Sequence, residues 1–154
     1  MTRRTVVCVG AVVEGAEGVL AVRQAPGHSL QGQWTIPWGR LEDGESPTVA
    51  AIRETREEAN IVADVVGLIG MQELPAPWRG WFALVYLCRH VSGAPAPDGR
   101  ETDQAEYLTL RRVDELHGAV EPWSAWLMRR VLQRDHAVIA ANPEHPYVPS
   151  IGYV

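Results

Sequence analysis

Six carboxylates lie within one segment of the chain, residues 39–61, which reads GRLEDGESPTVAAIRETREEANI. Three of them, Glu54, Glu57 and Glu58, are spaced i, i+3 and i+4. On a helix this spacing places all three side chains on one face. Like charges at such positions repel and weaken an isolated helix. A divalent cation would remove the repulsion, and a set of oxygen ligands suits Mg²⁺ or Mn²⁺.

A solvated acidic face would produce the same pattern and is the commoner explanation for an average helix. An exposed face usually carries a positive partner at i+4, whereas Glu54 has Glu58 there. Ala50 and Ala51 stand one turn earlier and leave room for an ion with its water molecules. We expect the core-facing side of this helix to point elsewhere and to carry the apolar residues Val49, Ile52 and Ala59. The pattern therefore favours a cation site.

The helix that holds these glutamates has clear start and stop signals. Ser46 is a good N-cap, and Pro47 suits the first helical position. The helix should run to about Ala59, where Asn60 can adopt the left-handed conformation that ends it. These signals predict a helix over residues 47–59.

The remaining pattern alternates short apolar strands with turns and one further long helix. Strands are predicted at 6–13, 19–24, 34–36, 61–74 with a break at Gly67 or Gly70, 81–91, 106–110 and 137–141. A polar loop is predicted at 92–105, a helical turn at 113–116 and an amphipathic helix at 122–134. The fold class is α/β (α+β), with one curved mixed sheet and helices on both faces.

Composition limits the classes of function. The 154 residues fit one domain, which we place at 1–136, followed by a strand and proline-rich tail at 137–154. A net charge of −5 disfavours nucleic acid as a partner. All 14 basic residues are arginine, which excludes a P-loop lysine and a Schiff-base lysine. No apolar run is long enough for a membrane span, so we expect a cytoplasmic protein.

The acidic segment resembles the Nudix box, a family signature written G-x5-E-x7-R-E-U-x-E-E-x-G-U, in which U is a bulky apolar residue. The matching positions are Gly39, Glu45, Arg53, Glu54, Glu57, Glu58 and Ile61. Thr55 replaces an apolar residue and Asn60 replaces the second glycine, and neither change removes a chemical group. The resemblance extends to about Arg134 and includes an acid–aromatic pair, Glu106-Tyr107.

The resemblance implies a Nudix fold, a mixed sheet sandwiched between helices. It also implies hydrolysis of a nucleoside diphosphate linked to another moiety, with Mg²⁺ or Mn²⁺ as cofactor and water attacking phosphorus. Glu54, Glu57 and Glu58 correspond to metal-binding carboxylates, and one of the three would also orient or deprotonate the water. Arg53 and Glu45 correspond to a structural pair within the catalytic segment. Glu106, expected at a strand start, is our choice for a fourth acid on the far side of the site, ahead of Asp98, Glu101 and Asp103 in the preceding loop.

The segment before the box carries the expected substrate contacts. Trp38 replaces the glycine usual in the family, and its backbone carbonyl is expected to bind metal. Its side chain would stack on a substrate ring or pack under a loop, and a positive φ there would strain it. Arg23 and Arg40 are the other residues expected to bind substrate. Nucleoside triphosphates, oxidised nucleotides and ADP-ribose-like compounds all remain candidate substrates. ADP-ribose is included because Pro77 lies 16 residues beyond the box, a spacing that the resemblance links with ADP-ribose-hydrolysing members of the family.

Two other functions are compatible with the resemblance. A catalytically silent Nudix module would sense a nucleotide or bind a partner, but the intact glutamates oppose it. An isoprenoid-diphosphate isomerase would need a cysteine at the site, and Cys8 and Cys88 both lie in predicted strands. The apolar tail, which includes Tyr147 and Val148, is expected to pack on its own domain or on a second copy in a homodimer.

Overall fold

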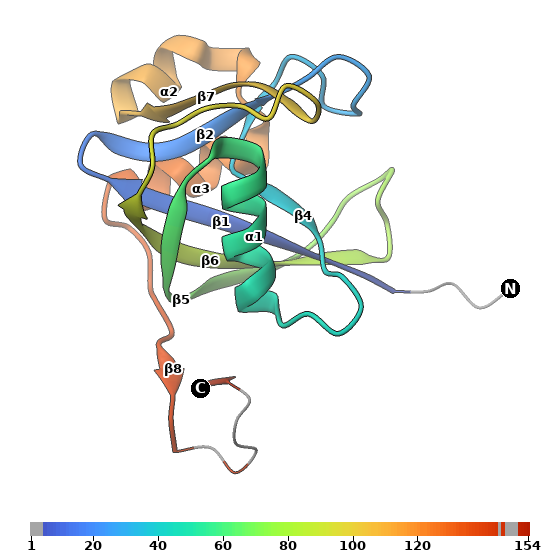
Figure 1. Cartoon of the computed structure of the whole chain (residues 1–154), viewed down its shortest axis with the longest axis vertical. Helices are drawn as coiled ribbons and strands as arrows, with labels where there is room; N and C mark the ends of the chain where they lie inside the picture. The colour runs from blue at the N-terminus through green and yellow to red at the C-terminus, as the bar shows by residue number, and fades with distance from the viewer. Residues whose placement is uncertain (1–4, 145, 147–150) are drawn as a thin grey trace, which may run out of the picture.

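The computed structural model describes residues 5–144, 146 and 151–154 (Figure 1). The strands are β1 (Val6–Gly15), β2 (Gly18–Gln24), β3 (Trp34–Thr35), β4 (Trp38–Arg40), β5 (Val62–Glu73), β6 (Trp81–Ser92), β7 (Thr102–Leu108), β8 (Ala141–Asn142) and β9 (Gly152–Tyr153). The helices are α1 (Pro47–Ala59), α2 (Leu110–Leu116), the 3₁₀ turn η1 (His117–Ala119) and α3 (Pro122–Leu132). No helix in the described part of the chain combines the length and apolar character needed to cross a membrane.

The main sheet is mixed, as predicted. Its strands follow the order β3-β2-β1-β6-β5, with β4 paired to β1 and β7 paired to β2. The pairing of β1 with β6 is parallel, and the other pairings within this sheet are antiparallel. Helix α1 lies on one side of the sheet and α3 on the other (Figure 1). The predicted break in β5 is present as register shifts near Gly67 and Gly70.

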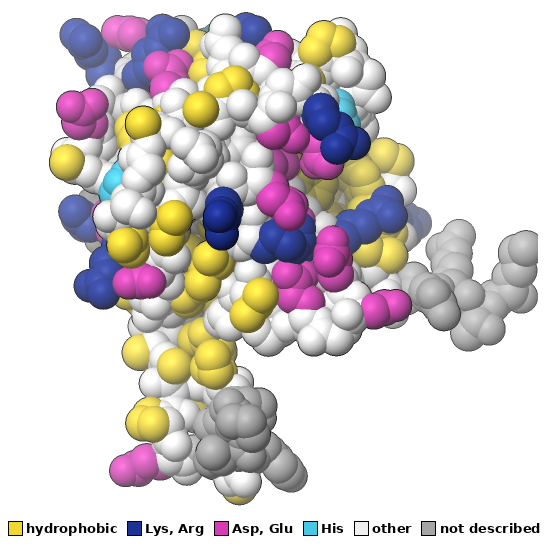
Figure 2. Space-filling model, in the orientation of Figure 1, with side chains coloured by type: hydrophobic (Ala, Val, Ile, Leu, Met, Phe, Trp, Pro, Cys, Tyr) yellow, Lys and Arg dark blue, Asp and Glu magenta, His cyan; other side chains and the backbone are white. Residues whose placement is uncertain are grey.

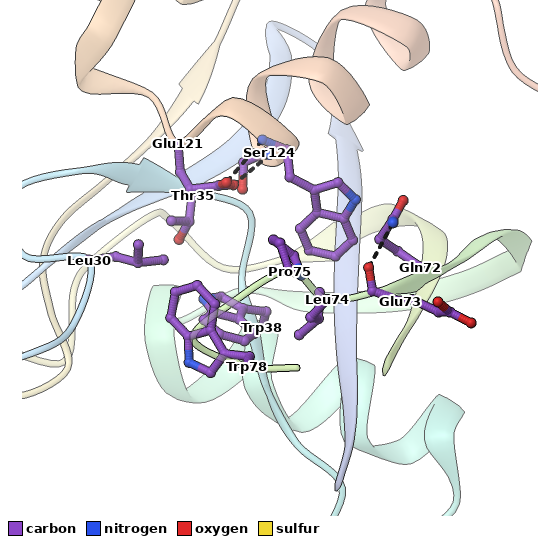
Figure 3. A pocket seen from close by; sticks show the side chains of 11 residues that line it. Leu30, Thr35, Trp38, Gln72, Glu73, Leu74, Pro75, Trp78, Glu121 and Ser124 are labelled. Atoms are coloured by element: carbon purple, nitrogen blue, oxygen red, sulfur yellow. Dashed lines mark hydrogen bonds between the residues drawn. The ribbon is translucent and has the colours of Figure 1, made fainter. Parts of the chain in front are cut away.

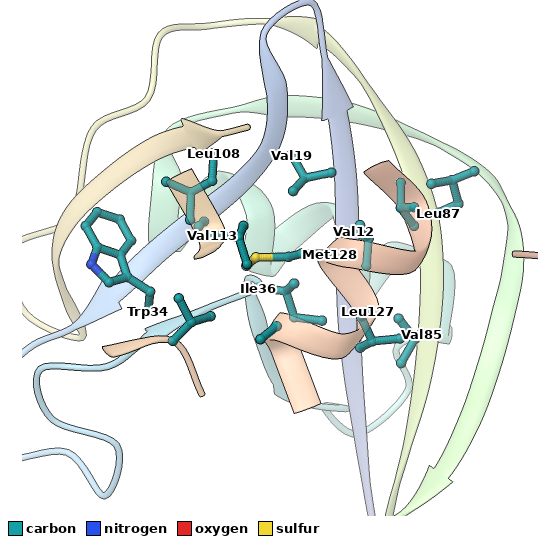
Figure 4. Close-up of a cluster of buried hydrophobic side chains, with 14 residues drawn as sticks. Val12, Val19, Trp34, Ile36, Val85, Leu87, Leu108, Val113, Leu127 and Met128 are labelled. Carbon is teal, nitrogen blue, oxygen red and sulfur yellow. The ribbon is translucent and has the colours of Figure 1, made fainter. Parts of the chain in front are cut away.

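Two hydrophobic clusters hold the helices on the sheet. Val12, Ala21 and Leu108 pack against Leu127 and Met128 on the α3 side (Figure 4). The second cluster joins strand residues to the small alanines Ala50, Ala51 and Ala59 of α1. Because alanine side chains are short, α1 lies close to the sheet beneath it.

Two predicted strands differ from the structure; in addition, the helical turn predicted at 113–116 is the longer helix α2, and β4 was not predicted. The strand predicted at 106–110 begins four residues earlier, at Thr102, because pairing with β2 extends the ladder into the polar segment. The strand predicted at 137–141 is reduced to a single bridge between Ile139 and Leu68, and the chain pairs further on as β8 with β9. Composition could not place either boundary, because tertiary pairing sets both.

The described part of the tail contacts the domain at two points. Ile139 exchanges backbone hydrogen bonds of 2.8 and 2.9 Å with Leu68 at the edge of β5. The ring of Tyr153 lies 5.6 Å from that of Tyr86, centroid to centroid. Tyr147 and Val148, part of the same prediction, lie outside the described residues.

Candidate active site

Helix α1 has the predicted ends. The Ser46 hydroxyl accepts a hydrogen bond from the Val49 amide at 3.4 Å, and Pro47 begins the helix. Asn60 ends it in the left-handed region, at φ 59° and ψ 27°. These caps fix where the helix begins and ends.

The buried face of α1 is the acidic one, which corrects our expectation. Ala59 is fully buried, as expected, but Val49 is exposed, while Glu54 and Glu58 are only 6% and 3% exposed. Glu57 points outward from the same helix, with 59% of its side chain exposed. The face predicted to carry the core is therefore partly in solvent, and two carboxylates lie against the sheet among small residues.

Strand β4 meets both buried glutamates. The Trp38 amide donates a hydrogen bond to Oε2 of Glu58 at 3.1 Å. At Gly39 a Cβ atom would overlap the Glu54 carboxylate, standing 2.6 Å from its Oε2 atom and nearer still to the others. The box glycine is thus required for close approach and not for an unusual backbone conformation. Among the described non-glycine residues positive φ occurs at three positions, and Trp38 is not one of them, so it is not strained there.

Arg53 binds three of the carboxylates at once. Its Nε and one terminal nitrogen donate to the two oxygens of Glu45 at 2.8 and 3.0 Å. The other terminal nitrogen donates to Glu54 at 2.7 Å and to Glu57 at 3.1 Å. This guanidinium lowers the pKa of Glu45. The structure therefore contains the predicted Arg53–Glu45 contact, and Arg53 also reaches the helix glutamates.

Burial disturbs the ionisation of the two inner glutamates. Desolvation raises the pKa of Glu54 to about 7, against the opposing hydrogen bond from Arg53. Desolvation also raises the pKa of Glu58 well above its ordinary value, and the neighbouring charge of Glu54 adds to this. Two buried carboxylates that repel each other are the environment that a divalent cation would stabilise. Among the described residues, no three acidic, histidine or cysteine side chains are close enough together to hold a metal ion. The carboxylates of Glu54 and Glu57 form ion pairs with Arg53 instead.

The structure does not bring Glu106 to this site. Glu106 lies in the middle of β7 and not at its start, opposite Ala21 of β2. Ala21 and Leu108 both pack on the α3 side, so residue 106 shares that side because alternate strand residues share a face. The glutamates of α1 lie on the other side of the sheet, which corrects the expected position of the fourth acid.

Among the loop acids, Glu101 is the one whose charge acts on both buried glutamates. The next residue, Thr102, is fully buried and donates its hydroxyl to the Glu58 carbonyl at 2.7 Å. Asp98 organises the loop by accepting 2.9 Å bonds from the amides of residues 100, 101 and 102. The negative charge of Glu101 contributes to the raised pKa of both Glu54 and Glu58. One feature of the sequence could have indicated this loop. Aspartate side chains often accept hydrogen bonds from backbone amides a few residues further on, and Asp98 precedes Thr102 by four residues.

The two arginines expected to bind substrate have protein partners. Arg23 makes a two-point contact with Asp103 at 2.7 and 2.9 Å. The Arg40 guanidinium lies 4.6 Å from the Trp81 ring centroid. Acidic side chains and arginines stand side by side on the face that carries α1 (Figure 2).

Trp38 is one of the residues that line a pocket of about 530 Å³. Trp38 and Trp78 form one end of it, with ring centroids 6.5 Å apart and planes nearly perpendicular. Glu121 and Ser124 lie at another end (Figure 3). Because the Trp38 amide holds Glu58, one residue joins this pocket to the buried carboxylates.

Comparison with known proteins gives one family. The NUDIX domain family model matches residues 1–131. A MutT-like protein from Streptomyces ambofaciens is 32% identical over 122 residues, covering 71% of this chain and 75% of that protein. An RNA pyrophosphohydrolase from Cereibacter sphaeroides is 28% identical over 146 residues, covering 81% and 86%. The mouse 8-oxo-dGDP phosphatase NUDT18 is 35% identical over 75 residues, but these are 49% of this chain and only 22% of that protein.

The fold comparison agrees. The crystal structure of a NUDIX hydrolase from Nitrosomonas europaea superposes with a TM-score of 0.75 at 22% identity, covering 87% of this chain and 73% of that one. The chain spans about a quarter of the length of some relatives, including a putative nudix hydrolase of Caenorhabditis elegans, of which it covers 25%. The family model covers most of the chain, and the box residues assemble around α1. The chain belongs to the Nudix hydrolase family.

Proposed function

We propose that this protein is a pyrophosphohydrolase, dependent on Mg²⁺ or Mn²⁺, that cleaves a nucleoside diphosphate linked to another moiety by attack of water on phosphorus. The observation that carries the proposal is the buried pair Glu54 and Glu58, held against the β4 backbone, with Glu57 on the same helix. A pair of repelling carboxylates in a nearly dry position destabilises a fold, so a role in binding a cation explains its presence.

Glu54, Glu57 and Glu58 would hold the cation, and Glu101 would add an oxygen from outside the helix. The carboxylate chemistry fits a hard ion. When bound, such an ion neutralises phosphate oxygens and lowers the pKa of an attacking water. We propose the Trp38 carbonyl as a further oxygen ligand.

Glu57 is our choice for orienting and deprotonating the attacking water. It is the most exposed of the three helix glutamates, so water reaches it. Arg53 fixes its direction through a 3.1 Å hydrogen bond, and Glu45 in turn fixes Arg53. A general base must be within hydrogen-bond reach of the proton it takes, and this chain of contacts limits where the Glu57 carboxylate can stand.

Glu101 replaces Glu106 in the proposed site. Its loop is tied to α1 through Thr102 and to its own backbone through Asp98. These hydrogen bonds restrict the backbone of the loop, so the Glu101 side chain starts from a fixed position although it is exposed to solvent.

On the substrate side, we propose that Trp38 forms a wall for the ring of the nucleotide. Arg23 and Arg40 would reach the phosphates only by leaving Asp103 and Trp81. The named relatives act on different compounds, an oxidised nucleoside diphosphate in one case and RNA in another, so they support the bond cleaved and not one substrate. The isomerase alternative finds no support, since Cys8 and Cys88 are both buried in the sheet.

The proposal is tested by a product screen. Purified protein is incubated with nucleoside triphosphates, oxidised nucleotides and nucleoside diphosphate sugars, with Mg²⁺, Mn²⁺ or EDTA. Hydrolysis in ¹⁸O-labelled water should place one label on a phosphate product, as attack on phosphorus requires. Absence of metal-dependent cleavage across the screen, with the protein folded, would refute the proposed activity.

A further inference from the structure

Thr102, the first residue of β7, is a polar side chain in a fully buried position. Its hydroxyl donates a hydrogen bond of 2.7 Å to the backbone carbonyl of Glu58, the next-to-last residue of α1. The last four carbonyls of a helix have no partner inside the helix, so a buried helix end needs partners from elsewhere. Thr102 supplies one of these partners from another part of the chain.

Glu58 is joined to two separate segments. Its carboxylate accepts the Trp38 amide of β4 at 3.1 Å, and its carbonyl accepts the Thr102 hydroxyl. The residue is only 3% exposed, so both hydrogen bonds form away from solvent. The box helix, β4 and the start of β7 therefore meet at a single residue of the site.

The loop that leads to β7 is held against the same end of α1. The Ala96 amide donates to the Ala59 carbonyl at 3.0 Å. The side-chain amide of Asn60 donates to the Ala94 carbonyl at 3.2 Å. Figure 1 shows the segment before β7 passing over the C-terminal end of α1. The helix end and the loop are thus connected at several points.

Glu101, the residue before Thr102, has a backbone that is held on both sides. Its amide donates to the Asp98 carboxylate at 2.9 Å, and its carbonyl accepts the Ala25 amide at 2.8 Å. The Asp98 carboxylate also accepts the Thr102 amide at 2.9 Å. Of the residues that fix this turn, Thr102 is the one bonded to Glu58, so its hydroxyl connects the proposed loop ligand to the proposed helix ligand.

We infer that Thr102 is a positioning residue of the active site: its hydroxyl, bonded to the Glu58 carbonyl, fixes the Glu101 carboxylate relative to the box helix and so sets the affinity of the site for its cation. Residues that orient metal ligands without touching the ion commonly contribute about 10- to 100-fold in metal affinity. The inference rests on the proposed function for the role of Glu101 as an oxygen ligand, but its test does not depend on hydrolysis.

The test is a titration of the metal-free protein with Mn²⁺, followed by the EPR signal of the free ion, without substrate. Thr102→Val removes the hydroxyl and keeps a β-branched side chain. Its Mn²⁺ dissociation constant should rise at least about tenfold. The variant should also melt about 2–10 °C lower, because the buried Glu58 carbonyl loses its donor. Thr102→Ser restores the hydroxyl and should recover most of the lost affinity.

A double-mutant cycle tests whether Thr102 acts through Glu101. Glu101→Gln removes the charge of the proposed ligand and should weaken Mn²⁺ binding by itself. If Thr102 acts by placing that carboxylate, the combined variant Thr102→Val/Glu101→Gln should bind Mn²⁺ about as weakly as Glu101→Gln alone. Losses that multiply in the combined variant would overturn the inference, because Thr102 would then act independently of Glu101.

Thr55 provides a matched control. It is also fully buried, and its hydroxyl donates to a backbone carbonyl of α1, that of Ala51, at 2.8 Å. This hydrogen bond stays within the helix and joins it to no other segment. Thr55→Val should therefore leave the Mn²⁺ affinity unchanged, which separates the effect of connecting the loop from that of losing a buried hydroxyl.

A second pair of variants covers the case in which Thr102→Val does not fold. Asp98→Ala and Asp98→Asn both remove the same charge from an exposed residue, but only asparagine keeps an oxygen that can accept the loop amides. Asp98→Ala should bind Mn²⁺ more weakly than Asp98→Asn. Equal affinities in this pair would show that the loop bonds do not set the position of the ligand and would overturn the inference.

The remaining outcomes separate this inference from the proposed function. Wild-type Mn²⁺ affinity in folded Thr102→Val would overturn the inference while metal-dependent hydrolysis stands. The expected Mn²⁺ affinities in a protein that cleaves nothing in the product screen would support the inference and refute the proposed function. A folded wild type that binds no Mn²⁺ would overturn the inference, and the product screen would then decide the proposed function by itself.

Discussion

Replacing Gly39 by alanine tests whether the position of Glu54 limits the reaction. A Cβ at residue 39 would lie under 3.0 Å from three atoms of the Glu54 carboxylate. Glu54 cannot turn freely, because it is 6% exposed and holds Arg53 at 2.7 Å. The new methyl group therefore forces either the carboxylate or strand β4 to move.

The size of the effect follows from this geometry. Relieving the overlap requires a shift of about 1 Å, and a displacement of that size at a catalytic group can cost about a hundredfold in rate. Stability should change less. Weakening the Arg53 contact costs about 1–3 kcal/mol, and an alanine in place of glycine returns about 0.4–1 kcal/mol by restricting the unfolded chain. We expect the melting temperature to fall by less than about 10 °C.

The assay compares kcat and the Mg²⁺ concentration for half-activation in wild type, Gly39→Ala and Gly70→Ala. Gly70 is the matched control, because a Cβ there meets no atom within 4 Å. Gly70→Ala should retain activity. A Gly39→Ala enzyme with wild-type kcat and Mg²⁺ dependence would show that the contact relaxes without consequence, and equal losses in both variants would remove the site-specific explanation.

Three further predictions concern the site and the tail. Glu57→Gln should reduce turnover at least about a hundredfold with the melting temperature preserved; wild-type turnover with Mg²⁺ would remove Glu57 from the mechanism. Glu101→Ala should reduce turnover by about 10- to 1000-fold while Glu106→Ala has little effect, and the reverse result in steady-state kinetics would restore the original assignment. Deleting 140–154 removes Tyr153, whose ring packs on the domain, and should lower the melting temperature by about 2–4 °C in a domain of this size; an unchanged thermal scan would show that the tail adds no stability.

Local signals predicted the helix that carries the box glutamates. Ser46, Pro47 and Asn60 act through hydrogen bonds and backbone preferences within a few residues, so the chain before and after them is enough to place both ends of α1. The mixed sheet followed from the order of apolar runs. What the sequence did not predict is the direction that α1 faces. Its alanines proved to be the contact surface because a helix with small residues can approach a sheet closely.

The face on which Glu106 lies depends on strand register, which cannot be derived from the spacing of residues in the sequence. Whether residue 106 faces α1 or α3 is decided by its pairing with Ala21, and a shift of one residue reverses the face. The register shift between Arg23 and Gln24 adds to the difficulty, since it alters the pairing at the start of β7. Glu101 lies in a loop that is held by the next residue, Thr102. The Thr102 hydroxyl donates a hydrogen bond to the carbonyl of Glu58, 44 residues before Thr102 in the chain.

Replacing Glu58 by glutamine tests whether this buried carboxylate lowers the stability of the fold. Its carboxylate is 3% exposed and has a pKa well above the ordinary value, so the folded state favours the protonated form. A raised pKa in the folded state means that stability falls as the pH rises from the unfolded value toward the folded one. Glu58→Gln removes the charge and keeps an oxygen to accept the Trp38 amide.

In EDTA, Glu58→Gln should therefore melt higher than wild type at pH 8, by at least about 2 °C. The difference should shrink toward pH 5, because a raised carboxyl pKa costs stability only as the pH rises above the ordinary carboxyl value. Mg²⁺ should raise the melting temperature of the wild type and not that of the variant, because ligand binding stabilises only a protein that still has the site. The variant should also lose turnover. A variant that melts lower than wild type at pH 8 in EDTA would mean that the Glu58 carboxylate supports the fold and would contradict its assignment as a ligand kept for function.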